Sequence, residues 1–201
     1  MTVLTGITPA GLRRLYCDLH KTDSEIAEFF GVERTTIGHM RKTYNITTRK
    51  SIGEIGEGMA IKELKSRGYK LKNMNEENKL SPFDILLEDQ VRIEVKTSTL
   101  NDDDRFRFVL TEKDGNENIE SETRIRLKNG RTKKIFRKTC DLLIFVGLES
   151  NGDCHFFIIE PSLIKDDMQT LNLPFNPFSK SKRNKHREDW DLVKKIMEVK
   201  R

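Results

Sequence analysis

Three charged residues, Asp84, Glu94 and Lys96, lie close together in the sequence, within two short apolar segments. The segments run from Pro82 to Leu87 and from Val91 to Thr97, and three polar residues separate them, so we expect an antiparallel hairpin. Two carboxylates and a lysine on one hairpin could bind a divalent cation and orient or deprotonate a water molecule.

The register of this hairpin decides whether the three groups meet. Counting back from the polar loop pairs Ile85 with Ile93 on an apolar face, which places Asp84 opposite Glu94 on the second face. Opposed residues have Cβ atoms about 4.5–5.5 Å apart, where two carboxylates repel unless a cation lies between them. Lys96 follows on the same face as Glu94. Each signal alone is typical of a solvated strand, but together they indicate a metal site.

A further carboxylate, Glu57, lies on a helix expected over residues 51–67. At 100° per residue it falls in the middle of the apolar stripe that contains Ala60 and Leu64. Burying an unpaired carboxylate costs several kcal/mol, so Glu57 should meet a cation, a metal site or a hydrogen-bond donor. A purely structural pairing is the alternative.

These segments together resemble the PD-(D/E)XK nuclease superfamily, which includes restriction enzymes, homing enzymes and junction resolvases. The resemblance rests on Gly56-Glu57, Ala60, Leu64 and Gly68-Tyr69, then Pro82-Phe83-Asp84 and Glu94-Val95-Lys96. One residue, Phe83, is inserted between the proline and the acid of the motif, and the acid is the member that matters chemically. The resemblance implies an α/β fold, a restriction endonuclease-like αβββαβ core with a mixed central sheet.

The resemblance also implies the role of each residue. Asp84 and Glu94 would bind Mg²⁺, with the Val95 carbonyl as a candidate third ligand, Glu57 in support and Lys96 activating the water. Mn²⁺ should substitute for Mg²⁺, because both prefer hard oxygen ligands. The implied reaction is hydrolysis of a DNA phosphodiester bond to leave a 5′-phosphate, and no small-molecule cofactor is expected.

The first 46 residues predict a separate, all-α domain. Thr8-Pro9 favours a helix start, and Thr22 with Glu25 forms a capping-box pattern for a second helix. The spacing of Ala27, Gly31 and Ile37 resembles a helix-turn-helix: alanine allows close helix approach, glycine makes the turn and isoleucine anchors the third helix. Plain helical hairpins and protein-binding modules share such patterns.

If this domain binds DNA, its third helix supplies the contacts. The candidates for base edges are Arg34, Thr35, Thr36 and His39, and the candidates for phosphates are Arg41 and Lys42. We place the junction in the polar, basic stretch from Ile46 to Lys50. The expected domains are therefore residues 1–46, the DNA-binding domain, and residues 51–201, the nuclease domain.

The rest of the nuclease domain gives weaker signals. We expect strands over residues 105–110, 141–146 and 155–159, and a polar, basic arm between residues 111 and 138 with turns at Gly115 and Gly130. After Pro161 we expect no further strand, but an irregular basic segment over 174–185 and then a helix from about Glu188. Trp190, Val193 and Ile196 or Met197 would dock that helix.

Composition limits the class of protein. The chain has 201 residues and a net charge of +5, with three basic stretches that lack acidic residues, at 39–50, 124–138 and 180–187. Such stretches suit a phosphate backbone, although solvated basic loops look the same. Three scattered cysteines argue against a disulfide framework. No apolar run approaches the roughly 18 residues of a membrane helix, so we expect a cytoplasmic protein without membrane contact.

The leading hypothesis is a Mg²⁺-dependent endonuclease for double-stranded or branched DNA, of restriction, homing or junction-resolving type. Cutting both strands requires two active sites, so a homodimer is expected. One alternative is a DNA-binding regulator whose nuclease fold is inert. Another is a nuclease directed at RNA.

Overall fold

The computed structural model describes residues 6–19, 21–46, 50–78, 80–112 and 120–200. The chain divides into two compact units, Met1–Ser51 and Ile52–Arg201. Among the described residues, no helix combines the length and apolar character that a bilayer span requires.

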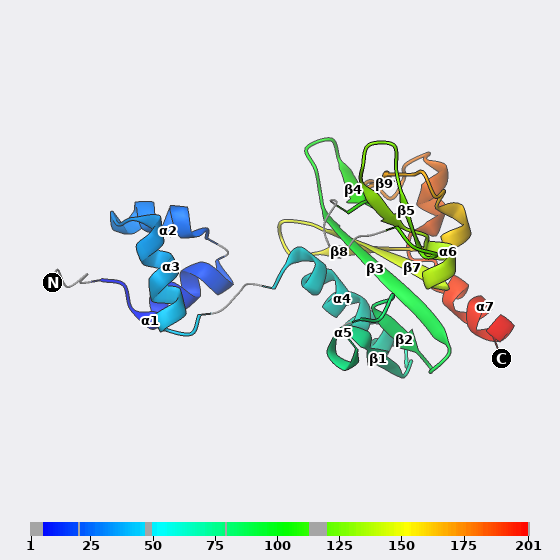
Figure 1. Cartoon of the computed structure of the whole chain (residues 1–201), viewed down its shortest axis with the longest axis horizontal. Helices are drawn as coiled ribbons and strands as arrows, with labels where there is room; N and C mark the ends of the chain where they lie inside the picture. Colours follow the sequence, from blue (N-terminus) through cyan, green and yellow to red (C-terminus); the bar gives the residue numbers. More distant parts are fainter. Residues whose placement is uncertain (1–5, 20, 47–49, 79, 113–119, 201) are drawn as a thin grey trace. The chain divides into compact units, whose positions relative to one another are not determined.

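The first unit is built from helices (Figure 1), which pack around a small apolar core. Helix α1 (Pro9–Arg13) continues as a π-helical turn, η1 (Arg14–Asp18), and is followed by α2 (Asp23–Phe30) and α3 (Arg34–Thr43). The buried side chains are those of Ile7, Leu12, Ile26, Ala27, Ile37 and Ile46. This core contains the alanine and the isoleucine of the predicted spacing.

Local chemistry sets the limits of α2. Thr22 Oγ1 accepts a hydrogen bond from the Glu25 backbone N–H at 3.1 Å, and the Glu25 carboxylate accepts one from the Thr22 N–H at 2.7 Å. This reciprocal capping box satisfies two N–H groups at the start of the helix. At the other end, Gly31 has a φ of 64°, a left-handed conformation that glycine adopts without steric cost.

One expectation for this unit was wrong. Ile46, expected in the junction, is buried in the core of the first unit. Residues 47–49 of the expected junction lie outside the described residues.

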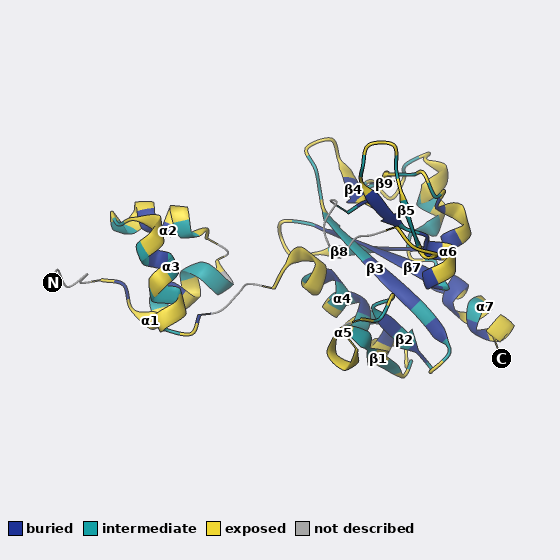
Figure 2. Ribbon diagram, viewed as in Figure 1, coloured by how far each residue is buried: buried dark blue, intermediate teal, exposed yellow. Residues whose placement is uncertain are grey.

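The second unit is organised around a five-stranded mixed sheet with the order β1-β2-β3-β7-β8 (Figure 1). The strands are β1 (Leu71–Asn73), β2 (Ile85–Leu87), β3 (Val91–Thr99), β7 (Leu142–Leu148) and β8 (Cys154–Ile159). Strands β3 and β7 are parallel, and the other neighbours are antiparallel. Strand β7 is buried along its whole length (Figure 2), as expected for the centre of a covered sheet.

Different elements cover the two faces of the sheet. One face packs against α4 (Ile52–Ser66) and α7 (Asp191–Lys200), and this layer includes Trp190, Val193 and Met197 as anticipated. The other face carries a phenylalanine-rich layer from a ribbon of β4 (Arg105–Val109) and β9 (Thr170–Pro174). The sheet is therefore enclosed between helices and a two-stranded ribbon.

The hairpin register agrees with the prediction where the ladder is regular. Ile85 pairs with Ile93 and Leu87 with Val91. The ladder ends at Ile85, however, so Phe83 and Asp84 are not ladder residues, and the predicted strand from Pro82 is too long. The reason is a local turn: Ser81 Oγ donates to the Phe83 carbonyl at 2.7 Å and accepts from the Phe83 N–H at 3.3 Å.

The connection from β3 to β7 keeps the expected αβββαβ order, because a helix precedes β7, but it also contains three strands that were not part of the expected core. Its only helix among the described residues is the four-residue α6 (Phe136–Thr139), preceded by β4 and by a hairpin of β5 (Arg124–Arg126) and β6 (Thr132–Lys134). Gly130 turns this hairpin with a φ of 78°, as predicted, whereas Gly115 lies outside the described residues. The second helix of the core is therefore short, and most of the described part of this connection forms β structure.

The remaining elements are short. They are α5 (Met74–Glu77) and the 3-10 turns η2 (Pro161–Leu163) and η3 (Lys182–His186). The expectation that no strand follows Pro161 was wrong, because Leu171 and Leu173 alternate with exposed or half-buried residues and pack β9 on the apolar layer. The terminal helix begins at Asp191, three residues later than expected.

Candidate active site

Glu94 is the centre of the candidate site and is only 1% exposed. Its Oε1 lies 2.7 Å from the Lys96 ammonium, and Lys134 Nζ lies 2.9 Å from Oε1 and 2.8 Å from Oε2. Burial by itself disfavours the charge of Glu94, but the two ammonium groups outweigh that effect and lower its pKa. Glu94 is therefore a buried, ionised carboxylate held between two lysines.

A hydrogen bond to the backbone of β3 holds the Asp84 side chain next to Glu94. Its Oδ2 accepts a hydrogen bond from the Val95 N–H at 2.7 Å, which fixes the carboxylate against β3 although Asp84 is outside the ladder. Burial and the nearby charge of Glu94 raise the pKa of Asp84. The two carboxylates thus repel each other, as the sequence predicted.

Glu57 reaches the site from α4. The Asn75 side-chain amide donates to Glu57 Oε2 at 2.8 Å and makes a long contact of 3.5 Å with Asp84 Oδ1. Partial burial and the charge of Asp84 raise the pKa of Glu57. Glu57 meets a hydrogen-bond donor, one of the three partners expected for it.

A close approach of α4 to β3 brings Glu57 to this position. A Cβ added to Gly56 would lie 2.1 Å from Thr97 Oγ1, a distance at which no side chain fits. The helix axis can therefore come this near the strand only with glycine at position 56. Glu57, the next residue of α4, is thereby placed near Asp84, to which Asn75 connects it.

Lys96 is the lysine of the predicted motif, and its side chain is 27% exposed. Burial disfavours its charge, but the attraction of Glu94 outweighs burial and raises the pKa of the ammonium. The structure therefore brings Asp84, Glu94 and Lys96 together, and Asn75 links Glu57 to Asp84.

Two residues of this cluster were missed by sequence reasoning. Lys134 lies in the basic stretch that we interpreted as an arm, and its place in the site follows from non-local contacts with Glu94 and Pro82, 40 and 52 positions earlier in the chain. Asn75 lies on α5, in a polar segment without apolar periodicity. Lysines and asparagines in such segments carry no signal that separates site residues from solvated ones.

The donor atoms suit a hard divalent cation. Asp84 and Glu94 offer carboxylate oxygens close to one another, and their mutual repulsion would be relieved by positive charge. Among the described residues, no three side chains of Asp, Glu, His or Cys gather closely enough to form a complete ligand cage. Mg²⁺ fits such a site, because it usually keeps several water ligands and takes one or two carboxylates from the protein.

The candidate DNA contacts of α3 divide into two groups. The side chains of Arg34, Thr35, His39 and Lys42 are exposed, and Thr36 is half-buried. Arg41 does not point outward as expected. It forms a two-pronged ion pair with Asp23, with both N···O distances at 2.7 Å, and stacks on Tyr16, so it holds α3 against the rest of the unit.

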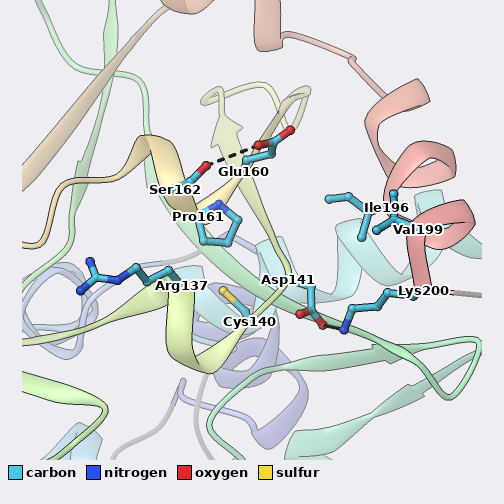
Figure 3. A pocket seen from close by; sticks show the side chains of 9 residues that line it. All are labelled: Arg137, Cys140, Asp141, Glu160, Pro161, Ser162, Ile196, Val199 and Lys200. Carbon is cyan, nitrogen blue, oxygen red and sulfur yellow. Dashed lines mark hydrogen bonds and ion pairs between the residues drawn. The ribbon is translucent and has the colours of Figure 1, made fainter.

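The second unit also contains a cavity of about 400 Å³ between α6, η2 and α7 (Figure 3). The figure shows Asp141 meeting the Lys200 ammonium at its edge, and the distance is 2.6 Å. The lining residues are Arg137, Cys140, Asp141, Glu160, Pro161, Ser162, Ile196, Val199 and Lys200. None of the four predicted catalytic residues lines this cavity, so the carboxylate site is separate from it.

No family model matches the sequence, and no curated protein matches it. Among solved structures, the chain is similar to a bacterial homing endonuclease, I-Ssp6803I, with a TM-score of 0.53 and 13% sequence identity. The match covers 76% of this chain and 97% of the other. At this identity the likeness concerns the fold, and it supports the predicted α/β class with a mixed central sheet. The chain therefore shares its fold with a bacterial homing endonuclease.

Proposed function

We propose that this protein is a Mg²⁺-dependent DNA endonuclease whose active site contains Asp84, Glu94 and Lys96. The observation that carries the proposal is the buried carboxylate of Glu94, with the half-buried Asp84 carboxylate bonded to the neighbouring Val95 N–H and the Lys96 ammonium 2.7 Å from Glu94. The fold it shares with a solved homing endonuclease supports the same conclusion.

Each residue has a distinct part in the proposed reaction. Asp84 and Glu94 would hold the cation, with the Val95 carbonyl as a further candidate ligand, and Mn²⁺ should replace Mg²⁺. A bound cation would polarise the scissile phosphate and lower the pKa of a bound water. The raised pKa of Lys96 keeps its ammonium charged, so we assign it to orienting the water and offsetting phosphoryl charge.

Glu57 is proposed as a supporting group. The Asn75 amide connects it to Asp84, so changes at Glu57 would alter the orientation of the Asp84 carboxylate. This role is weaker than direct metal binding, and it predicts that loss of Glu57 is less severe than loss of Asp84.

We propose that the first unit is a helix-turn-helix that selects the DNA site. The support is geometric: Gly31 makes the turn, Ile37 anchors α3, and four of the predicted contact residues of α3 are exposed. Base contacts would come from Arg34, Thr35, Thr36 and His39, and phosphate contacts from Lys42. The basic β5–β6 hairpin and η3 would add phosphate contacts from the second unit.

A separate site-reading unit favours a site-selective enzyme of homing or restriction type. Cleavage of both strands would need a homodimer, because one chain carries one candidate site. Sedimentation with and without DNA tests this, and a monomer under both conditions would argue against it.

The decisive test is cleavage of supercoiled plasmid, linear duplex and a synthetic four-way junction in Mg²⁺ or EDTA. We expect cutting with Mg²⁺ and none with EDTA. Asp84→Ala and Lys96→Ala should each lower the rate by at least about 100-fold, whereas the exposed Lys65→Ala on α4 should leave it unchanged. The substrate that is cut distinguishes a site-selective enzyme from a junction resolvase. DNA binding without cutting in any metal would instead identify an inert DNA-binding regulator.

A further inference from the structure

Lys134 makes an unusual set of contacts for a surface-strand lysine. Its ammonium lies 2.9 and 2.8 Å from the two carboxylate oxygens of Glu94, and 3.0 Å from the backbone carbonyl of Pro82. The side chain is 18% exposed. Two carboxylate oxygens and a carbonyl oxygen are the hard donors that a divalent cation would use. The lysine therefore occupies oxygens that a metal would need.

Burial and an ion pair fix the position of β6, the strand that carries Lys134. Thr132 and Lys133, the preceding residues of β6, are fully buried, and Arg124, the β5 partner of Lys134, forms an ion pair with Glu112 at 2.6 Å. The long, unbranched side chain can still swing away from Glu94 while the strand stays in place. The ammonium is thus a tethered cation rather than a fixed part of the core.

Simultaneous binding of Lys134 and a divalent ion at Glu94 is disfavoured. Both Glu94 oxygens are already engaged by Lys134, and Oε1 also by Lys96. A cation at about 2.1 Å from either oxygen would meet the ammonium at close range, with like charges repelling in a buried setting. One of the two must leave.

We propose that Lys134 is a tethered counter-ion that holds Glu94 in the metal-free protein and that a divalent cation must displace to bind there. The inference rests on the proposed function, because it assumes that Glu94 is a metal ligand. It accounts for the burial of Glu94, which is 1% exposed and has both carboxylate oxygens in contact with the Lys134 ammonium. It also makes Lys134 a determinant of metal affinity, a role that neither the motif nor the fold assigns to it.

The test is calorimetric titration of the full-length, DNA-free protein with Mg²⁺ and with Mn²⁺. Lys134→Met should bind each ion about tenfold more tightly than the unchanged protein, because the competing charge is gone. Lys128→Met is the matched control: it removes the same charge from the exposed turn of the same hairpin, and should leave the affinity unchanged. Thermal melts give a second readout. Without metal, Lys134→Met should melt at a lower temperature, and added metal should raise its Tm more than that of the unchanged protein.

Equal or weaker metal binding by a folded Lys134→Met protein would overturn the inference. If that variant does not fold, Lys134→Gln carries the same expectation, because it also removes the charge, and its amide, which can still donate to Glu94, favours folding. Asp84→Asn separates the two levels of the proposal. If Asp84→Asn abolishes metal binding but Lys134→Met does not bind the metal more tightly, the metal site stands and only the counter-ion role of Lys134 is rejected. Absence of binding in every variant, together with absence of cleavage, rejects the metal site and the counter-ion together.

Discussion

Gly56 on α4 and Thr97 on β3 lie so close that even a methyl group cannot be placed between them, since a Cβ at position 56 would be 2.1 Å from Thr97 Oγ1. This contact sets the distance between the helix that carries Glu57 and the strand that carries Glu94 and Lys96. The neighbouring Gly58 has no atom within 4 Å of the equivalent position. Gly56 and Gly58 of the same helix thus have different physical roles.

Gly56→Ala should lower the free energy of unfolding by about 2–3 kcal/mol, because the helix must shift to relieve the overlap. Gly58→Ala, on the same helix, should cost nothing and can add up to about 1 kcal/mol through helix propensity. Urea unfolding measures both, and cleavage assays should show a loss in the first variant alone. Equal free energies of unfolding for the two variants would mean that the close contact between Gly56 and Thr97 does not affect stability.

Neutralising Glu94 should destabilise the metal-free protein. Glu94→Gln keeps the shape of the side chain but leaves Lys96 and Lys134 facing each other without their shared partner, which should cost about 3 kcal/mol. The comparison is Glu63→Gln, which breaks an exposed pair with Arg67 on α4 and should cost less than about 1 kcal/mol. Chemical denaturation in EDTA gives both values, and similar losses would contradict the central role of Glu94.

Neutralising Asp84 should have the opposite sign. Burial and the charge of Glu94 raise the pKa of Asp84 in the folded protein. Above this raised pKa the carboxylate is charged in both states, and its charge destabilises the folded protein relative to the unfolded one. Asp84→Asn should therefore raise the Tm of the metal-free protein at pH 7 while abolishing cleavage. A lower Tm in EDTA would show that the hydrogen bond from Val95 outweighs the repulsion.

Asp141 should make stability depend on pH in the acid range. It bonds Arg92 on β3 and Lys200 on α7, at 2.9 and 2.6 Å. Partial burial disfavours its charge, but those partners outweigh burial and lower its pKa to about 2, from an ordinary 3.8. A depressed carboxyl pKa contributes stability above the unfolded value, and this contribution is lost as the pH falls through the folded value.

Asp141→Asn should thus lose about 2 kcal/mol at pH 7, and its deficit should shrink as the pH is lowered from about 4 toward 2. Urea unfolding over pH 7 to 3 measures the difference, with the exposed Asp102→Asn as the control that shows no deficit. A deficit that is constant over this range would contradict the pKa assignment.

Arg41 and Lys42 are adjacent cations on α3 that should behave differently. Arg41→Ala removes the ion pair with Asp23 and the stacking on Tyr16, and should destabilise the first unit by about 1–2 kcal/mol. Lys42→Ala should change stability by less than about 0.5 kcal/mol. If the unit binds DNA, Lys42→Ala should reduce by about one the steepness with which the logarithm of the binding constant falls with the logarithm of the salt concentration. Thermal melts and binding isotherms at several salt concentrations measure these effects, and loss of stability in Lys42→Ala would reverse the assignment.

Sequence reasoning succeeded where alternation and spacing are local. The pairing of Ile85 with Ile93 follows from counting apolar residues across a short loop, and the helix starts follow from capping patterns at Thr8 and Thr22. These features depend on neighbours within a few positions, so one sequence contains enough information to predict them.

It failed where a residue's role depends on distant segments. Lys134 enters the site through contacts with Glu94 and Pro82, which lie 40 and 52 positions earlier in the chain, and nothing around Lys134 in the sequence marks it. Strand β9 was missed because its alternation of apolar and polar residues is too short to distinguish a strand from a loop. Its strand structure depends on pairing with β4, which lies far away in the sequence. Arg41 was misread because an arginine on a helix surface looks the same whether its partner is a phosphate or Asp23.

The parallel pairing of β3 with β7 has a consequence for how the chain folds. Ile93 pairs with Leu142, 49 positions later, and the hairpin that brings Lys134 lies inside the loop that this pairing closes. Closing such a loop is slow compared with forming the local hairpin of β2 and β3. Glu94 should therefore stay in contact with water during most of refolding, and become enclosed only in the last, rate-limiting step.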